Sequence, residues 1–230
     1  MSAEIPEPAL SRRDARKFDR RQAIIEAARH SFLEHGYAGT SMSALVKTLG
    51  GSKGTLWSYF PSKEELFGAV IEQVSAAFRA ELANVLATRG ELETVLAAFC
   101  RTFMRKISAP ESLETWRLVV AESGRFPEVG QIFYQQAARH TREALTRFLE
   151  PYIAEGRLRQ ARPDHMAERL IDLCVGPQTR RLWGVEAHLA SSAAEDADEI
   201  VQLFLRAYAP EPSAAPKRLG VNPVVGEARR

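Results

Sequence analysis

The sequence predicts an all-α protein, with a small helical domain at the N-terminus followed by a larger helical domain. Apolar residues recur at spacings of three and four along most of the 230 residues, which is typical of amphipathic helices. Glycines, prolines and residues that cap helices divide the chain into segments of helical length. No run of β-type residues and no internal repeat is present. These observations favour a helical fold over any fold that contains a sheet.

The first expected element is a basic arm, and the first helix follows it. Residues 1–17 contain two prolines and the basic sequence SRRDARK, so we expect a disordered arm. Its arginines could enter a minor groove, or the arm could be a solvated leader that adds only general attraction. A helix over 19–35 comes next, because Ile24, Ala28 and Phe32 recur at a spacing of four.

Two short helices joined by a glycine turn come next. Thr40 and Ser41 can cap the first of them. Gly50-Gly51-Ser52 ends it, because glycine adopts the left-handed conformation that a tight turn needs. The second short helix is predicted over 53–60. Its outward side chains are Lys53, Thr55, Trp57, Ser58 and Tyr59. A surface with a cation, hydroxyls and aromatic rings suits the phosphates and base edges of a major groove.

A capping box opens a long fourth helix. In Ser62-Lys63-Glu64-Glu65 the serine and the second glutamate occupy the positions that satisfy the free amides of a helix start. The apolar face of this helix continues to Leu86, and Thr88-Arg89-Gly90 follows it as a boundary. The helix therefore begins beside the two short helices and ends in the second half of the chain, which makes it the mechanical link between them.

Apolar stripes predict further helices in the second half of the chain. They lie at about 92–107, 113–123, 132–153, 164–183 and 195–208. Gly176-Pro177 is expected to interrupt the helix at 164–183, because proline removes a backbone donor. The last helix has an apolar face that must be covered, formed by Ile200, Leu203, Phe204 and Ala207. Prolines and small residues predict a disordered tail over 210–230.

The charges are distributed unevenly along the chain. The formal net charge is only +2, but residues 1–63 carry ten Lys and Arg against six Asp and Glu. Residues 64–210 carry 17 Lys and Arg against 21 Asp and Glu. A basic N-terminal part on an acidic body indicates nucleic acid as the partner of the first part.

Several classes of function find no support in the sequence. No stretch reaches the roughly 18 apolar residues of a membrane helix, and the N-terminus lacks an apolar signal core, so we expect no membrane partner and a cytoplasmic protein. The five histidines have no companion at metal-ligand spacing, and no phosphate-binding glycine loop or nucleophile elbow is present. We therefore expect no metal, no cofactor and no enzyme. Cys100 and Cys174 are interpreted as buried free thiols, with a redox pair as the alternative.

The motifs of the first third occur together at fixed spacings. They are Gly36-Tyr37, Thr40-Ser41, Ser52-Lys53-Gly54-Thr55-Leu56, Tyr59-Phe60 and Ser62-Lys63-Glu64 followed by Leu66-Phe67. Over about residues 19–70 they resemble the DNA-binding domain of TetR/AcrR-family transcriptional regulators. Gly51 departs from the family pattern, which commonly has an apolar residue there, and Trp57 stands where tyrosine is usual. The ending LFLRAYAP and Gly176-Pro177 are similar to the AefR-like branch of the family.

The resemblance implies a division of the chain and a set of DNA contacts. It implies a helix-turn-helix domain over 18–62 and a helical ligand-binding and dimerisation domain over 63–209, joined by the helix at 63–86. The major groove would be contacted by Lys53, Gly54, Thr55, Trp57 and Tyr59, and the phosphates by Thr40, Ser52 and Lys63. Because one short helix reads only a few base pairs, a homodimer on a palindromic operator follows, with 164–183 and 195–208 as its interface.

The resemblance also implies a small-molecule effector. The body carries aromatic and polar residues that could line an apolar cavity, although core packing explains each aromatic residue by itself. They are Phe99, Phe103, Trp116, Phe133, Gln136, Arg180 and Trp183. The expected function is a ligand-responsive regulator, most often a repressor, that a small apolar molecule releases from DNA. The alternative is a small-molecule-binding or protein-interaction helical protein without specific DNA binding, to which only Gly51 and Trp57 point.

Overall fold

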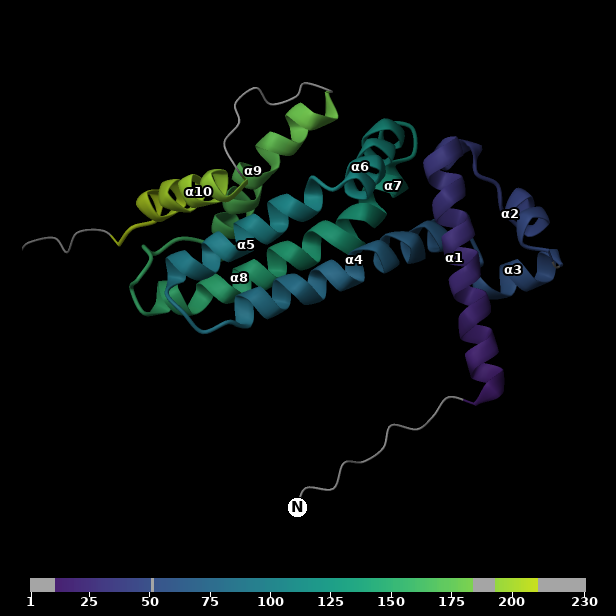
Figure 1. Ribbon diagram of the computed structural model, residues 1–230, viewed down its shortest axis with the longest axis horizontal. Coiled ribbons are helices and arrows are strands. Elements are labelled where there is room, and N and C mark those ends of the chain that lie inside the picture. The colour runs from purple at the N-terminus through teal and green to yellow at the C-terminus, as the bar shows by residue number, and fades with distance from the viewer. Residues whose placement is uncertain (1–10, 51, 184–192, 211–230) are drawn as a thin grey trace, which may run out of the picture.

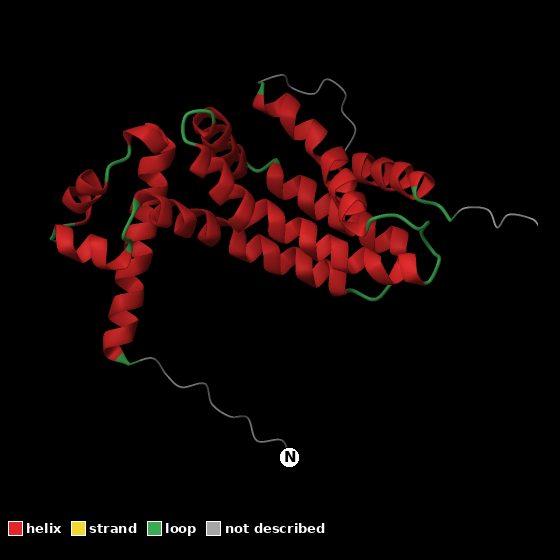
Figure 2. Cartoon of the chain, turned by 180° about the vertical axis from the view of Figure 1, so that it is seen from behind, coloured by secondary structure: helices red, strands yellow, loops and turns green. Residues whose placement is uncertain are grey.

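The computed structural model describes residues 11–50, 52–183 and 193–210. Within these residues every regular element is a helix, which confirms the all-α prediction (Figure 1). The elements are α1 (Arg12–Gly39), α2 (Met42–Leu49), α3 (Lys53–Tyr59), α4 (Lys63–Ala87), α5 (Leu92–Ile107), α6 (Pro110–Ser123), α7 (Pro127–Phe133), the π-helix η1 (Tyr134–Ala138), α8 (Arg139–Ala154), α9 (Pro163–Leu182) and α10 (Ala193–Ala207). Figure 2 shows the same helices from behind, with α1 to α3 at one end of the molecule.

Helix α1 begins at Arg12, so residues 12–17 are helical and are not part of a disordered arm as the sequence predicts. The Ser11 hydroxyl caps this start by accepting a hydrogen bond from the Asp14 amide. Arginine, lysine and alanine are good helix formers, which explains the earlier start. At the other end Gly36 has a φ of 75°, so the chain kinks where a break is predicted and then makes one more turn to Gly39.

An apolar core joins α1, α2 and α3 to the first half of α4. The buried rings of Phe32, Tyr37 and Phe67 contact one another, with centroids 5.1 to 5.7 Å apart. The same core contains Val119 of α6 and Val129 of α7, which are also buried. Helices α6 and α7 therefore complete the core of the N-terminal half, and a movement of either helix would change the packing of that core.

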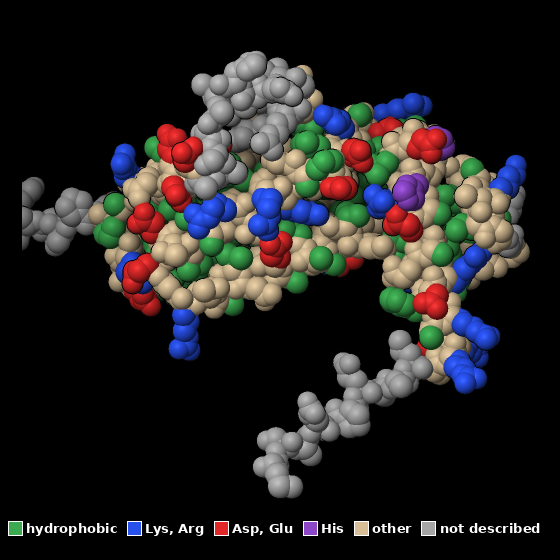
Figure 3. All heavy atoms as spheres, viewed as in Figure 1, with side chains coloured by type: hydrophobic (Ala, Val, Ile, Leu, Met, Phe, Trp, Pro, Cys, Tyr) green, Lys and Arg blue, Asp and Glu red, His purple; other side chains and the backbone are tan. Residues whose placement is uncertain are grey.

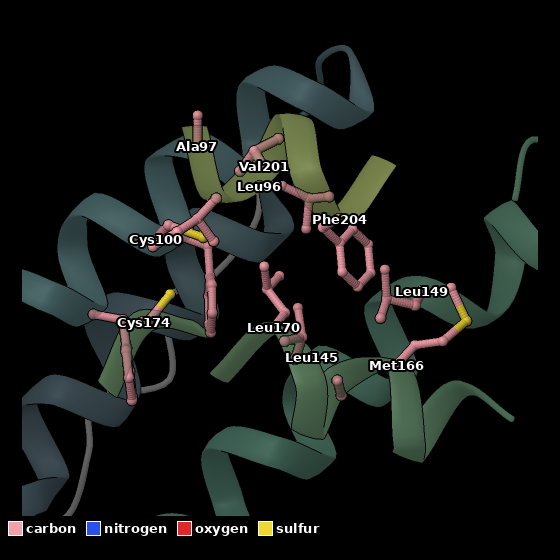
Figure 4. Close-up of a cluster of buried hydrophobic side chains, with 14 of the residues drawn as sticks. Leu96, Ala97, Cys100, Leu145, Leu149, Met166, Leu170, Cys174, Val201 and Phe204 are labelled. Atoms are coloured by element: carbon pink, nitrogen blue, oxygen red, sulfur yellow. The ribbon is translucent and has the colours of Figure 1, made fainter. Parts of the chain in front are cut away.

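A second core fills the space between α5, α8, α9, α10 and the end of α4. Figure 4 shows Leu96 and Cys100 of α5 beside Val201 and Phe204 of α10, with Leu170 of α9 near them. All five side chains are buried, and α5 contacts α4, α9 and α10. Helix α5 therefore lies at the centre of this half, and α10 is part of the protomer's own fold.

The last helix corrects the predicted arrangement of its apolar face. Ile200 and Phe204 are buried in the second core, where Phe204 is only 1% exposed. Leu203 and Ala207 are exposed at the edge of this face, and Leu203 is 48% exposed. The four residues therefore do not pack as one face. Helix α10 packs on α5 in the same protomer, and this contact buries Ile200 and Phe204 but leaves Leu203 and Ala207 exposed.

Two further helices differ from the sequence prediction. Gly176-Pro177 does not interrupt α9, which is continuous from Pro163 to Leu182. The single helix predicted over 132–153 contains one π-helical turn, η1, between α7 and α8. A π-helical turn shifts the hydrogen-bonding partner by one residue. At η1 the guanidinium of Arg79 donates to the Gln136 carbonyl over 2.8 Å, so a side chain of α4 supports this turn.

The two cysteines lie in contact inside the second core. Cys100 of α5 and Cys174 of α9 are both free and buried. The neighbouring Cys100 thiol, and then burial, raise the pKa of Cys174 far above its ordinary value. The thiolate is the reactive form of cysteine, so this environment favours unreactive packing.

Candidate nucleic-acid interface

Helices α2 and α3 form a helix-turn-helix whose turn is held by α1. Gly50 ends α2 with a φ of 61°, in the left-handed region that glycine adopts readily. The guanidinium of Arg20 donates hydrogen bonds to the carbonyls of Leu49 and Gly50, which are free acceptors at the end of α2. The Ser52 hydroxyl then accepts from the Thr55 amide and caps α3. The start of α3 is therefore fixed relative to α1.

The outward face of α3 presents small and aromatic groups. Gly54, Trp57 and Ser58 are exposed, and the Trp57 side chain is 44% exposed. Thr55 is half-buried at the edge of this face, with its hydroxyl 3.0 Å from the hydroxyl of Ser52. A face of this kind can enter a groove closely, because two of its side chains are short and a large ring stands beside them.

The other two residues predicted to contact the major groove are placed differently. Lys53 begins α3, and its side chain lies outside the described residues. Tyr59 is half-buried and packs against the first core, so it does not project freely from α3 as the sequence predicts. Tyr59 is half-buried because α3 ends beside the core. The next residue, Phe60, is no longer helical and is buried, so the last turn of α3 lies close to the core.

Thr40 is a correction to the predicted phosphate contacts. Its side chain is only 2% exposed, and its hydroxyl donates to the Gly36 carbonyl over 2.9 Å. The same hydroxyl lies 3.0 Å from the hydroxyl of Ser31. Thr40 therefore holds the kink that ends α1, and its side chain is not available to a phosphate. Ser41, its neighbour, caps α2 instead by accepting from the Ala44 amide.

Lys63 is half-buried, and its ammonium contacts groups of the protein itself, while its predicted contact with a phosphate stays a prediction. The Nζ atom donates to the carbonyls of Tyr37 over 2.9 Å and Thr40 over 3.3 Å. It also lies 4.2 Å from the centre of the Tyr37 ring and 5.9 Å from that of Phe126. The cation therefore binds the turn between α1 and α2 to the start of α4, which a sequence motif for a helix cap does not reveal.

Sequence reasoning misses the residues that join the two halves at this point. The Tyr37 and Phe126 rings meet edge to face, with centroids 5.3 Å apart. A carboxylate oxygen of Glu122 lies 3.4 Å from the Ala38 amide, which donates to it. Glu122 lies in the last turn of α6, and Phe126 immediately precedes α7. No local sequence pattern indicates that either residue contacts the N-terminal half. They place this turn directly against the turn that precedes α2.

The pKa values of two ionisable groups at the junction are changed by their surroundings. Burial, and then the charge of Glu64, raise the pKa of Tyr37 well above its ordinary value, so this phenol stays neutral. The Tyr37 hydroxyl donates to the Glu64 carboxylate over 3.2 Å. Hydrogen bonds at the start of α4 lower the pKa of Glu64, the backbone amide contributing most and Ser62 and Tyr37 less. Glu64 is therefore ionised at neutral pH, and it accepts the hydrogen bond of Tyr37 in the first turn of α4.

The residues predicted to line an effector cavity do not form one cluster. Phe99 and Phe103 are stacked in the second core, with ring centroids 5.9 Å apart. Trp116 and Phe133 contact each other at 5.5 Å, near the junction of the two halves. Gln136 lies in a groove of about 510 Å³ beside α4 and the end of α3. Trp183 is 73% exposed, and the Arg180 side chain lies outside the described residues.

Among the residues that the structure describes, no group of three or more His, Cys, Asp or Glu side chains is placed to hold a metal ion. None of the described helices combines the length and the apolar composition that crossing a bilayer requires. The helix-turn-helix is therefore the best-defined candidate site in this part of the chain.

Two family models match the chain, one on each half. Residues 24–70 match the model of bacterial regulatory proteins of the tetR family. Residues 94–210, which are half of the chain, match the C-terminal domain of AefR-like transcriptional repressors. The first match covers the helix-turn-helix and the start of α4, and the second covers the helices of the second core.

Individual relatives agree with these models. The HTH-type transcriptional repressor AcnR of Corynebacterium diphtheriae is 40% identical over 76 residues, which cover 33% of this chain and 38% of that repressor. Among solved structures, the flavonoid-responsive regulator FrrA has a TM-score of 0.72 at 29% identity, covering 85% of this chain and all of FrrA. A protein of Mesorhizobium loti described as a TetR-family transcriptional regulator has a TM-score of 0.70 at 26% identity, covering 84% of this chain and 98% of its own.

Proposed function

Because the chain belongs to the TetR family of bacterial regulatory proteins, we propose that it is a transcriptional repressor that binds operator DNA through α3. The observation that carries this proposal is the exposed face of α3, with Gly54, Trp57 and Ser58, on a helix that Arg20 and Ser52 hold in place. A major groove admits a helix of this size, and short side chains beside an aromatic ring can contact base edges and thymine methyl groups. Such a repressor works beside the chromosome, in the cytoplasm.

The operator is proposed to be palindromic and the repressor a homodimer. Helix α3 has seven residues, so one copy contacts too few base pairs to select one site in a genome. Two exposed leucines support an interface on α9 and α10: Leu173 is 41% exposed and Leu203 is 48% exposed. Both belong to the helices that the sequence predicts as the interface, and a second copy would remove them from water.

The signal that releases the repressor is proposed to be a small, largely apolar molecule. The half-buried rings of Trp116 on α6 and Phe133 on α7 contact each other beside the junction. A ligand inserted between such rings would displace α6 and α7, whose Val119 and Val129 belong to the core of the DNA-binding part. FrrA responds to flavonoids, as its name states, which supports an aromatic effector for this chain.

A mobility shift on the DNA upstream of the protein's own gene tests the proposal. We expect wild type to shift this DNA at nanomolar concentration in the presence of competitor DNA. Trp57→Ala should weaken this binding by about tenfold or more, because one good base contact contributes about 1–3 kcal/mol. Tyr134→Ala is the control, since Tyr134 is exposed to a similar extent, 42%, but lies on η1. Equal affinities of both variants and wild type would exclude α3 as the reading helix.

A further inference from the structure

The first turns of α1 carry a cationic face that the helix-turn-helix does not use. Residues 12–21 contain six Lys and Arg against two Asp. At about 100° per residue, the side chains of Arg12, Arg13, Arg16 and Lys17 lie within an arc of about 140° on one side of the helix. We call these four residues the cationic face. Asp14 and Phe18 lie outside this arc, and Asp19 lies about 20° beyond its edge at Arg12.

The cationic face is exposed and has no internal counter-charge in the described part of the chain. All four side chains are exposed, and none forms an ion pair with a described carboxylate. Asp14, the nearest acid in sequence, accepts a hydrogen bond from the Ser11 hydroxyl. Some other arginines are paired, as Arg101 is with Asp198 at 3.0 Å. In Figure 3 the blue side chains gather at the free end of α1, with few red ones among them.

The cationic face points toward the side of α1 on which α3 lies. Arg20, one turn after Arg16 on the same side of the helix, binds the carbonyls at the turn before α3. Arg21, one turn after Lys17, lies over the Phe60 ring at the end of α3, 5.1 Å from its centre. Helix α3 therefore lies against Arg20 and Arg21, the residues that follow the cationic face along α1. Figure 1 shows the start of α1 extending past α3.

The start of α1 reaches along a short stretch of duplex beyond Arg20, which holds the turn before α3. Arg12 precedes Arg20 by eight residues, or about 12 Å along the helix axis. This is about three to four base pairs at 3.4 Å each. A duplex bound by α3 offers phosphates over this distance beyond the half-site. Opposite the cations only Phe18 is a large apolar residue, which is too little to insert the helix into a membrane surface.

We propose that the cationic face binds the phosphates of the operator that flank the half-site contacted by α3. This inference rests on the proposed function of α3 as a DNA-reading helix. The ligand is the sugar-phosphate backbone of duplex DNA, so the face adds affinity and fixes position without reading bases. It also extends the bound sequence beyond the base pairs that two copies of α3 contact.

The test compares two operators and two variants of the full-length protein. The long operator carries about ten extra base pairs at each end, and the trimmed operator ends at the edges of the half-sites. Arg13→Ala/Lys17→Ala removes two adjacent cations of the face, and Arg147→Ala removes an exposed cation of α8 as the control. Affinities are measured by fluorescence anisotropy from 50 to 300 mM salt, after circular dichroism confirms equal helix content.

We expect the double variant to bind the long operator about tenfold or more weakly than wild type at 100 mM salt. Because a dimer would lose four phosphate contacts at about 0.9 each, its salt slope should fall in magnitude by about three to four. On the trimmed operator the double variant and wild type should bind alike, and Arg147→Ala should match wild type on both.

Two results would overturn the inference while leaving the proposed function intact. One is wild-type affinity of the double variant for the long operator; the other is an equal loss on both operators, which would place the cations elsewhere. Loss of binding to phosphatidylserine vesicles with unchanged operator binding would assign the face to membranes and overturn the inference as well. A wild type that binds neither operator would instead remove the proposed function and the inference together.

Discussion

Lys63 connects three parts of the molecule through one ammonium group. Its two carbonyl acceptors belong to Tyr37 in the last turn of α1 and to Thr40, which caps α1. Its own backbone begins α4, and the Phe126 ring comes from the turn between α6 and α7. Hydrogen bonds from a charged donor to carbonyls are stronger than neutral ones, and they are stronger still where water is partly excluded. The structure therefore assigns Lys63 to the stability of the junction.

Lys63→Ala should lower the free energy of unfolding by about 1–2 kcal/mol, because two carbonyls lose a charged donor. Lys17→Ala is the matched control: Lys17 is exposed, and its removal should change stability by less than about 0.5 kcal/mol. Urea denaturation followed by circular dichroism measures both. If the two variants unfold at the same urea concentration, the junction contacts of Lys63 contribute nothing.

Gly36 has a conformation that disfavours a side chain, and a Cβ atom there would also displace the carboxylate of Glu122. Its φ of 75° is unfavourable for other residues, and a Cβ atom there would lie 2.5 Å from an oxygen of Glu122. Gly36→Ala should therefore cost about 1–3 kcal/mol of stability. Gly124→Ala is the control, because Gly124 has a φ of −66° and open space, and should stabilise by up to about 1 kcal/mol. Thermal unfolding measures the melting temperature of both variants. A melting temperature of Gly36→Ala equal to or above that of Gly124→Ala would contradict the prediction.

At the scale of elements, α10 has two faces with different roles. Phe204 fills the second core, and truncating it to alanine should cost about 3–5 kcal/mol without acting on assembly directly. Leu203 is exposed in the protomer, and Leu203→Glu should place a charge in the proposed interface. Light scattering is expected to show a dimer for wild type and a folded monomer for Leu203→Glu. A wild-type protein that is monomeric at micromolar concentration would refute the interface on α10.

Most elements could be predicted from the sequence, because helices depend on local periodicity and caps. Ser41, Ser52 and Ser62 cap the helices that the sequence assigns to them. Contacts between distant segments could not be predicted this way. Thr40 and Lys63 have residue types that suit phosphates, but folding brings them against carbonyls in the last turn of α1. The π-helical turn and the burial of Phe204 likewise depend on the packing of neighbouring helices.

At the scale of the whole molecule, two connections link the halves. One is α4, which is 25 residues long and has its first turn beside α3 and its last turns in the second core. The other is the junction of α6 and α7, where Glu122 in the last turn of α6 and Phe126 just after it contact the last turn of α1. A rigid helix and a second contact together can convert a displacement of α6 and α7 into a rotation of α3. This gives a physical route by which an effector in the second half would change DNA binding.

The proposed repressor function depends on α3 reading a DNA sequence. Selection of bound duplexes from a random library, followed by anisotropy on the enriched sequence and a scrambled one, tests this most directly. We expect an inverted repeat with half-sites about one helical turn apart, or a multiple of it, bound about a thousandfold more tightly than the scrambled duplex. Enrichment of no sequence, or equal affinity for both duplexes, would contradict the account.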